Sequence, residues 1–99
     1  MKLPIEMDKR RVEEFCRRNR IVRLSLFGSV LREDFGADSD VDILVEFEAG
    51  AVVTLLDMVR MEEELAQMIG RPVDLRTPQE LSRYFRAEVV ASAVPQYVA

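Results

Sequence analysis

The sequence predicts a small α/β domain, of the α+β kind, with a three-stranded mixed sheet flanked by about four helices. Short apolar runs that suit strands alternate with longer segments in which apolar residues recur every three or four positions. The chain has 99 residues, which is the size of a single domain with one hydrophobic core. With 48% hydrophobic and 32% charged residues, its composition is that of a globular protein. We therefore expect one domain over residues 1–99.

The first half of the chain predicts a helix, a strand, a short helix and a second strand. Residues 5–19 place apolar side chains at helical spacing, and residues 21–27 (IVRLSLF) are an apolar run of strand length. Gly28 interrupts this strand, and Ser29 is a good N-cap for a short helix. Residues 41–47 (VDILVEF) form the second predicted strand.

The second half predicts a long helix, a short strand and a last helix. Residues 55–69 repeat apolar side chains in steps of three and four, and Gly70 ends this helix. Residues 71–76 (RPVDLR) suit a short third strand, with the proline near its start. The stretch TPQE at 77–80 is a capping box with proline at the first helical position. It predicts a helix that runs from there to about residue 93.

Several side chains are expected to pack in the core of this fold. Met58, Met61 and Met68 lie on the apolar face of the long helix and are assigned to the core. Tyr84 and Phe85, in the last predicted helix, are expected to pack against the sheet. The apolar tail over residues 93–99 is a possible surface for contact with a partner.

Composition excludes several classes of function. The chain has no histidine, which removes the commonest general base and the commonest zinc ligand, so a metal here would be a hard, oxygen-binding cation. A net charge of −4 argues against broad binding to nucleic acid. The single cysteine, Cys16, lies at an apolar helical position and is expected to be a small buried hydrophobe. The sequence shows neither a membrane span nor a signal peptide, so we expect a cytoplasmic protein.

Three aspartates are candidates for a metal site. Side chains alternate between the faces of a strand, so Asp40 and Asp42 point the same way at the start of the second strand. Asp74 lies on the third strand and joins them on one polar face if the two strands are neighbours. Clustered carboxylates repel one another unless a cation neutralises them. One or two Mg²⁺ ions, arriving with a nucleotide, are the expected partner.

The Gly28-Ser29 pair is a candidate phosphate site. A glycine between a strand and a helix lets the backbone approach a ligand closely, and amides at a helix start favour phosphate. Ser29 adds a hydroxyl donor there, and Arg32 lies one turn further on, within reach of a phosphate oxygen. The chain contains neither a Walker A pattern nor GxGxxG, so it is neither a P-loop protein nor a dinucleotide-binding fold.

Plainer interpretations exist for many of these acids. A D-x-D pair alone also suits a turn and a helix cap. Asp34 and Asp38 suit a solvated loop, and Glu46 and Glu48 suit the surface at the end of the second strand. The combination of Asp40 and Asp42 with Gly28-Ser29 and a third acid is much more specific than any one of these features.

This combination resembles the signature of the DNA polymerase β-like nucleotidyltransferase superfamily. The run GSVLREDFGADSDVDILVEF, from residue 28 to 47, resembles its minimal branch, the MNT-domain antitoxins found beside HEPN-domain toxins. TPQEL at 77–81 and AVPQYV at 93–98 are also similar to that group, so the resemblance covers nearly the whole chain. One departure is Val30, because many members carry arginine directly after the Gly-Ser pair.

The resemblance implies a polymerase β-like fold and a set of roles. It implies transfer of AMP from ATP, with two Mg²⁺ ions, to a tyrosine hydroxyl of a partner HEPN toxin, and a complex with that partner. The residues that it implies for catalysis and metal binding are Asp40, Asp42 and Asp74. Those that it implies for the nucleotide and its phosphates are Gly28, Ser29, Arg32 and Ser39.

Two other classes of function stay open at this point. The first is an antitoxin that neutralises its toxin by binding alone. The second is a transferase that acts on a small molecule or adds nucleotides to RNA, although such enzymes usually carry a further substrate domain, and the acidic charge argues against RNA.

Overall fold

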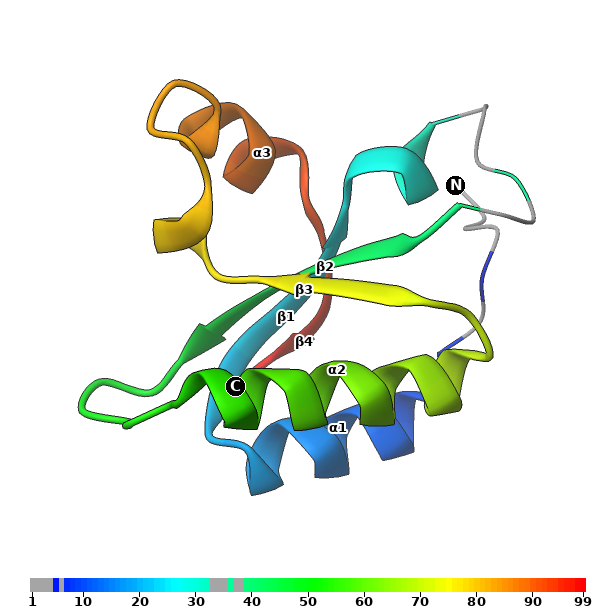
Figure 1. The fold of residues 1–99 in the computed structure, drawn as a ribbon, viewed down its shortest axis with the longest axis vertical. Helices are drawn as coiled ribbons and strands as arrows, with labels where there is room; N and C mark the ends of the chain where they lie inside the picture. The colour runs from blue at the N-terminus through cyan, green and yellow to red at the C-terminus, as the bar shows by residue number, and fades with distance from the viewer. Residues whose placement is uncertain (1–4, 6, 33–35, 37–38) are drawn as a thin grey trace.

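The core of the fold is a mixed four-stranded sheet. The computed structural model describes residues 5, 7–32, 36 and 39–99. The strand order is β3-β2-β1-β4, with β1 antiparallel to both of its neighbours and β2 parallel to β3 (Figure 1). The strands are β1 (Ile21–Phe27), β2 (Val41–Phe47), β3 (Val73–Arg76) and β4 (Val94–Val98).

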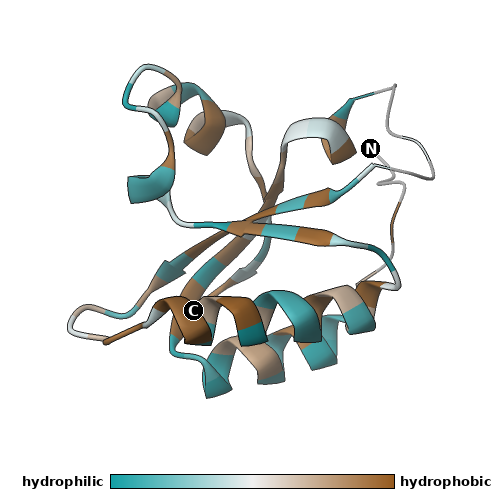
Figure 2. Ribbon diagram, in the orientation of Figure 1, coloured by the Kyte–Doolittle hydropathy of each residue, from teal (hydrophilic) through white to brown (hydrophobic). Residues whose placement is uncertain are grey.

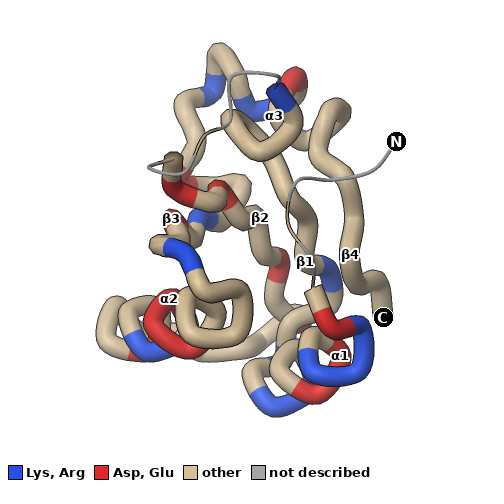
Figure 3. Tube along the Cα trace, turned by 90° about the vertical axis from the view of Figure 1, so that its right-hand side faces the viewer, with Lys and Arg blue, Asp and Glu red and all other residues tan. Residues whose placement is uncertain are grey.

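Helices α1 (Lys9–Arg18) and α2 (Leu55–Ile69) cover one face of the sheet, and α3 (Arg86–Ser92) lies on the other side (Figures 1 and 3). Two short 3₁₀ helices, Gly28–Leu31 and Pro78–Glu80, complete the described elements. Because α1 and α2 occupy the same face, much of the opposite face is left for polar side chains. Within the described residues, no helix has the length and hydropathy that a membrane crossing requires.

The boundaries of α2 follow directly from its sequence. Thr54 and Asp57 form a capping box, in which the Asp57 N–H donates to Thr54 Oγ1 at 3.1 Å and the Thr54 N–H donates to Asp57 Oδ2 at 3.0 Å. Hydrogen bonds from the Thr54 backbone N–H and from the Thr54 side chain lower the pKa of the Asp57 carboxyl. Gly70 ends the helix at φ +78°, a left-handed conformation that favours glycine. The predicted helix over 55–69 is confirmed, as are the strands over 21–27 and 41–47.

The hydrophobic core lies between the sheet and the pair α1 and α2. Phe15 and Cys16 of α1 are fully buried against strand residues, and burial raises the pKa of the Cys16 thiol to about 12. Met61 is buried, and Met58 and Met68 pack against the core, as predicted. The strands contribute the alternate residues that face the helices, which include Leu24, Leu26, Val41, Ile43, Val45, Val73 and Leu75.

Truncation of the largest core side chain should strongly destabilise the fold. We expect Phe15→Ala to lower the free energy of unfolding by about 3–5 kcal/mol, because it removes a fully buried ring and leaves a cavity. Urea denaturation of the variant beside Val90→Ala, a partly exposed position on α3, measures this difference. The control should change stability by less than about 0.5 kcal/mol. Equal effects at the two positions would contradict the packing described here.

The prediction of one helix over residues 77–93 is wrong. The capping box forms, with the Thr77 N–H donating to Glu80 Oε1 at 3.1 Å, but it closes only the 3₁₀ turn Pro78–Glu80. The guanidinium of Arg86 donates to the Pro78 carbonyl at 2.7 Å and also to the carbonyls of Gln79 and Leu81. A side chain thus satisfies the carbonyls that a continuing helix would pair with its own amides. The regular helix α3 begins only at Arg86.

The expected three-stranded sheet is also wrong by one strand. The tail considered for partner contact contains β4, which pairs with the free edge of β1. Its β-branched and aromatic residues suit a strand, and an open edge beside it supplies the hydrogen bonds. Three regular helices, rather than about four, flank the sheet over the described residues. Tyr84 and Phe85 are exposed instead of packing on the sheet, because they lie in the turn before α3.

Candidate functional site

The D-x-D pair opens strand β2. Val41 points into the core and is fully buried, whereas Asp40 is exposed and Asp42 is half-buried on the opposite face. This is the alternation that a strand imposes. The Val41 N–H donates to the Pro72 carbonyl at 2.9 Å, which ties the start of β2 to the residue just before β3. Both carboxylates therefore lie on the sheet face that α1 and α2 do not cover.

Parallel pairing of β2 and β3 places Asp74 directly beside Asp42. The two residues are register partners, so their side chains share one face of the sheet. Arg76, two residues further along β3, donates to the Asp74 carboxylate from Nε at 3.0 Å and from Nη2 at 3.4 Å. The prediction that acids of the second and third strands share one face of the sheet therefore holds for Asp42 and Asp74. The pairing of Asp74 with Arg76 is an additional feature of the site.

The Gly28-Ser29 turn packs against these acids. Gly28 has φ +71°, and a Cβ built on it would lie 2.3 Å from Asp42 Oδ2. The Ser29 N–H donates to that oxygen at 3.4 Å, and the Ser29 hydroxyl donates to the Asp40 carbonyl at 3.2 Å. The turn is a short 3₁₀ helix that begins at Gly28, so the predicted role of Ser29 as N-cap is wrong. Ser29 instead joins the turn to the D-x-D segment.

The electrostatics of the site centre on Asp42. Burial raises the pKa of the Asp42 carboxyl above its ordinary value, and the neighbouring charges of Asp74 and Asp40 raise it further. The Ser29 N–H and the charge of Arg32 act in the opposite direction. A raised pKa at a carboxyl among other carboxyls is typical of sites that receive a cation or a proton.

The segment that leads into β2 is held by an arginine that the sequence did not single out. Arg71 donates from Nη2 to the carbonyls of Gly36 and Ser39, the latter at 3.3 Å. The Ser39 hydroxyl accepts from the Gly36 N–H at 3.1 Å, which closes a turn just before Asp40. Arg71 belongs to no recognisable sequence motif. Its role depends on the approach of β3 to β2, which brings it close to residues 36 and 39. Asp34 and Asp38, assigned to solvent, lie outside the described residues.

The donor set suits Mg²⁺. Carboxylate oxygens are the ligands that this ion prefers, and Asp42 and Asp74 present them side by side. In the part of the chain that the structure describes, there is no group of three acidic or cysteine side chains that lie close enough together to hold an ion. Asp74 is engaged by Arg76, so an ion at Asp42 and Asp74 would take over the role of that guanidinium.

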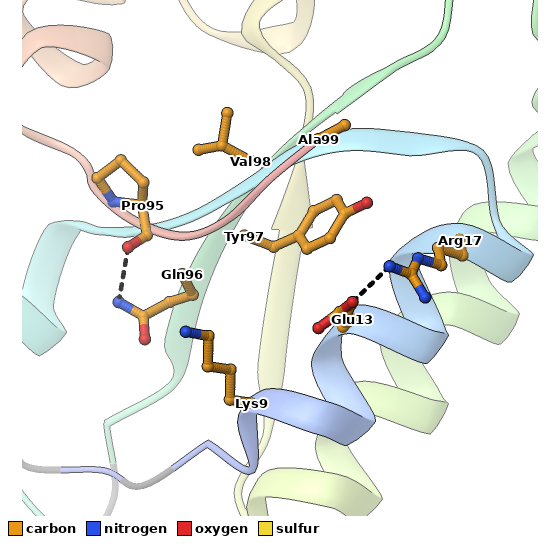
Figure 4. Close-up of a pocket in the computed structure, with 8 residues that line it drawn as sticks. All are labelled: Lys9, Glu13, Arg17, Pro95, Gln96, Tyr97, Val98 and Ala99. Carbon is orange, nitrogen blue, oxygen red and sulfur yellow. Dashed lines mark hydrogen bonds and ion pairs between the residues drawn. The ribbon is translucent and has the colours of Figure 1, made fainter.

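Two grooves differ in their relation to these acids. One, of about 410 Å³, lies between α2 and β3 and is lined in part by Asp74 and Arg76. The other, of about 620 Å³, runs between α1 and β4 (Figure 4). Lys9, Glu13 and Arg17 form its α1 side, and Glu13 pairs with Arg17. The second groove contains none of the predicted site residues, so it belongs to a different part of the surface.

Comparison with known sequences gives a consistent picture. The sequence pattern of the nucleotidyltransferase domain family matches residues 9–95. Over 86 residues the chain is 35% identical to a candidate protein adenylyltransferase of Methanocaldococcus jannaschii, which covers 87% of this chain and 90% of the relative. It is 40% identical over 63 residues to a protein adenylyltransferase of Thermococcus cleftensis, which covers 64% of this chain and 62% of the relative.

Solved structures share the fold. A candidate minimal nucleotidyltransferase superposes with a TM-score of 0.72 at 38% identity, over 88% of this chain and 87% of the other. A toxin–antitoxin structure with AMP-PNP gives 0.73 at 20% identity, over 94% and 75% of the two chains. A tri-AMPylated HEPN toxin of Shewanella oneidensis in complex with its MNT antitoxin gives 0.65 at 19% identity, over 92% and 70%. The last two likenesses concern the fold alone.

Proposed function

Because the chain belongs to the nucleotidyltransferase domain family, we propose that it transfers AMP from ATP to a tyrosine hydroxyl of a HEPN-domain toxin and thereby acts as an antitoxin. One structural observation carries the proposal. The Gly28-Ser29 turn touches Asp42, and Asp42 lies beside Asp74 on the neighbouring strand. The turn that we assign to phosphate binding and a pair of carboxylates thus meet at one point on the open face of the sheet.

The relatives support both halves of this proposal. Two relatives are named as protein adenylyltransferases, one of them as a candidate. Among the fold neighbours, one toxin–antitoxin structure contains AMP-PNP, an ATP analogue, and another contains a HEPN toxin that carries AMP groups. An ATP analogue and an AMP-modified HEPN toxin therefore accompany this fold in other proteins.

The residues of the site have distinct tasks in the transfer. Asp42 and Asp74 would hold Mg²⁺, joined by Asp40 if its exposed side chain turns toward them, and the bound ion would neutralise phosphate charge and lower the pKa of an attacking hydroxyl. The Gly28-Ser29 turn would lie against the phosphates, and Arg32 would donate hydrogen bonds to their oxygens. The Ser29 hydroxyl would do the same on leaving the Asp40 carbonyl, to which it donates in this structure. Ser39 closes the turn that presents Asp40.

The reaction forms a bond between the acceptor oxygen and the α-phosphorus of ATP. The bond between the α- and β-phosphates breaks, and pyrophosphate leaves. The hydroxyl proton must leave the acceptor, and in a chain without histidine the carboxylates of the site are the groups that can receive it. We assign to Asp74, which lies on the edge strand β3, the task of orienting the acceptor hydroxyl.

Mass spectrometry of the partner tests the proposal directly. The protein is co-expressed and co-purified with a candidate HEPN-domain partner, ATP and Mg²⁺ are added, and the intact mass of each chain is recorded. We expect the partner to gain one or more AMP-sized increments and to gain none when EDTA is present. A stable complex whose partner gains no mass with any common nucleoside triphosphate would contradict the transfer.

A second function, neutralisation by binding alone, has one observation in its favour. The Asp74 carboxylate is engaged by Arg76, and both donors of Ser29 are engaged by Asp40 and Asp42. These contacts make the site stable without a ligand, as expected of a purely structural arrangement. Protection of cells that express the toxin by a variant without transfer activity would favour this second function.

A further inference from the structure

The start of α2 exposes an unusual concentration of large apolar side chains. Three of them lie within five consecutive residues and form what we call the α2 apolar patch: Leu55, Leu56 and Val59, with exposed fractions of 82%, 57% and 45%. Figure 2 shows this end of α2 in brown. Single exposed apolar residues are common, but a contiguous group on one helix end is typical of an interaction site.

The patch continues into the groove that reaches Asp74. Leu55, Met58 and Val59 line this groove of about 410 Å³ on the α2 side. Asp74 and Arg76 line it on the β3 side. A molecule that packs on Leu55 and Val59 therefore lies next to the carboxylate assigned to the acceptor hydroxyl. This continuity connects the surface to the reaction.

The exposed edge of β3 also limits how a partner can bind there. The Leu75 N–H donates to Glu62 Oε2 of α2 at 3.0 Å, so this edge amide is already satisfied. An incoming strand would have to displace that carboxylate to extend the sheet. Recognition along this groove therefore depends on side chains of α2 and β3 rather than on strand addition.

Charge around the groove specifies the chemistry of the partner surface. Three of the four charged side chains that line it are acids, namely Glu62, Asp74 and Glu80. The fourth, Arg76, is paired with Asp74. An apolar surface with an acidic border is complementary to an apolar anchor flanked by lysine or arginine.

We propose that the α2 apolar patch is the docking surface for the protein that accepts AMP, and that this protein presents an apolar anchor bordered by basic residues. The inference rests on the proposed function and extends it to the recognition of the acceptor. Docking on Leu55 and Val59 would bring the acceptor hydroxyl to Asp74, because all three residues line the same groove.

A pair of substitutions at one position tests both the surface and its charge. Both Leu55→Glu and Leu55→Lys remove the apolar contact. The glutamate also extends the acidic border of the groove, whereas the lysine places a positive charge opposite a basic partner. We expect both to weaken binding to the HEPN-domain partner by more than about tenfold, with the lysine variant weaker than the glutamate variant. Titration calorimetry gives the dissociation constants, and binding of ATP to the isolated protein should be unchanged.

Val90→Glu is the matched control, since Val90 is 40% exposed on α3 and lies outside this groove. It should leave partner binding within about twofold of the original protein. If both Leu55 variants bind the partner as tightly as the original protein does, the proposed docking surface is wrong and the proposed function stands. If the lysine variant binds at least as well as the glutamate variant, the basic chemistry of the partner is wrong. If the original protein forms no complex, both proposals fail.

Discussion

Replacement of Asp42 by asparagine should reduce the rate of AMP transfer by more than about 100-fold. Loss of an outer partner of a metal ligand already costs about 10- to 100-fold, so loss of a proposed ligand should cost more. Asparagine keeps the shape of the side chain and an oxygen that can accept from the Ser29 N–H. Transfer is measured as AMP incorporated into the partner per unit time, with saturating ATP and Mg²⁺.

The same variant should be at least as stable as the original protein at neutral pH. The folded protein raises the pKa of Asp42, so the fold favours the protonated carboxyl and loses that contribution as the pH rises through the raised value. Above this range the ionised Asp42 opposes folding, and a neutral asparagine removes the opposition. Thermal unfolding at neutral pH measures the effect. A large loss of stability would show that Asp42 is mainly structural.

Glu46→Gln provides the control for Asp42→Asn. Glu46 lies on the same strand and the same face, and it pairs in register with Arg23 of β1 rather than with β3. The loss of one negative charge from β2 is therefore common to both variants. Transfer should be nearly normal in Glu46→Gln, and an equal loss in the two variants would mean that overall charge, not the site, controls the rate.

Substitution of Gly28 by alanine should damage both stability and transfer. Its backbone has φ +71°, which costs an L-residue about 1–2 kcal/mol. The added Cβ would also lie 2.3 Å from Asp42 Oδ2, so the carboxylate must move. We expect a loss of transfer close to that of Asp42→Asn, together with a lower midpoint of chemical denaturation.

Gly50→Ala separates these two contributions. Gly50 has φ +84°, but nothing lies within 4 Å of a Cβ built there. It should therefore show the backbone cost without the collision, with reduced stability and normal transfer. Normal transfer in Gly28→Ala as well would mean that the close contact between the turn and Asp42 has no part in the reaction.

The parts of the fold set by local pattern could be predicted from the sequence. The strands over 21–27 and 41–47 and the helix over 55–69 each have a continuous periodicity and clear ends, and all three are confirmed. The region after β3 could not be predicted, because its outcome depends on distant contacts. Arg86 satisfies the carbonyls of the preceding turn, and β4 forms because β1 offers an open edge.

Part of the candidate site could likewise be predicted from the sequence, and part could not. Alternation along the strands predicted that Asp42 and Asp74 share a face, provided that β2 and β3 are neighbours, and the register places them side by side. The hydrogen bonds of Ser29 to the D-x-D segment and of Arg71 to the Ser39 carbonyl were not predictable. Each joins segments distant in sequence, and serine and arginine offer too many possible partners for sequence spacing to decide among them.

The strand order also determines how the site is coupled to local opening of the chain. Strands β1 and β2 are interior, with a neighbour on both sides, whereas β3 and β4 form the edges of the sheet. Interior amides exchange their hydrogens with solvent mainly when the whole domain unfolds, while edge strands open in smaller fluctuations. Asp42 is therefore carried by the slowest-exchanging part of the molecule, and Asp74 by a strand that can separate from it transiently. The backbone amide of Asp42 should accordingly be better protected from exchange than the backbone amide of Asp74, although the two carboxylates form one pair.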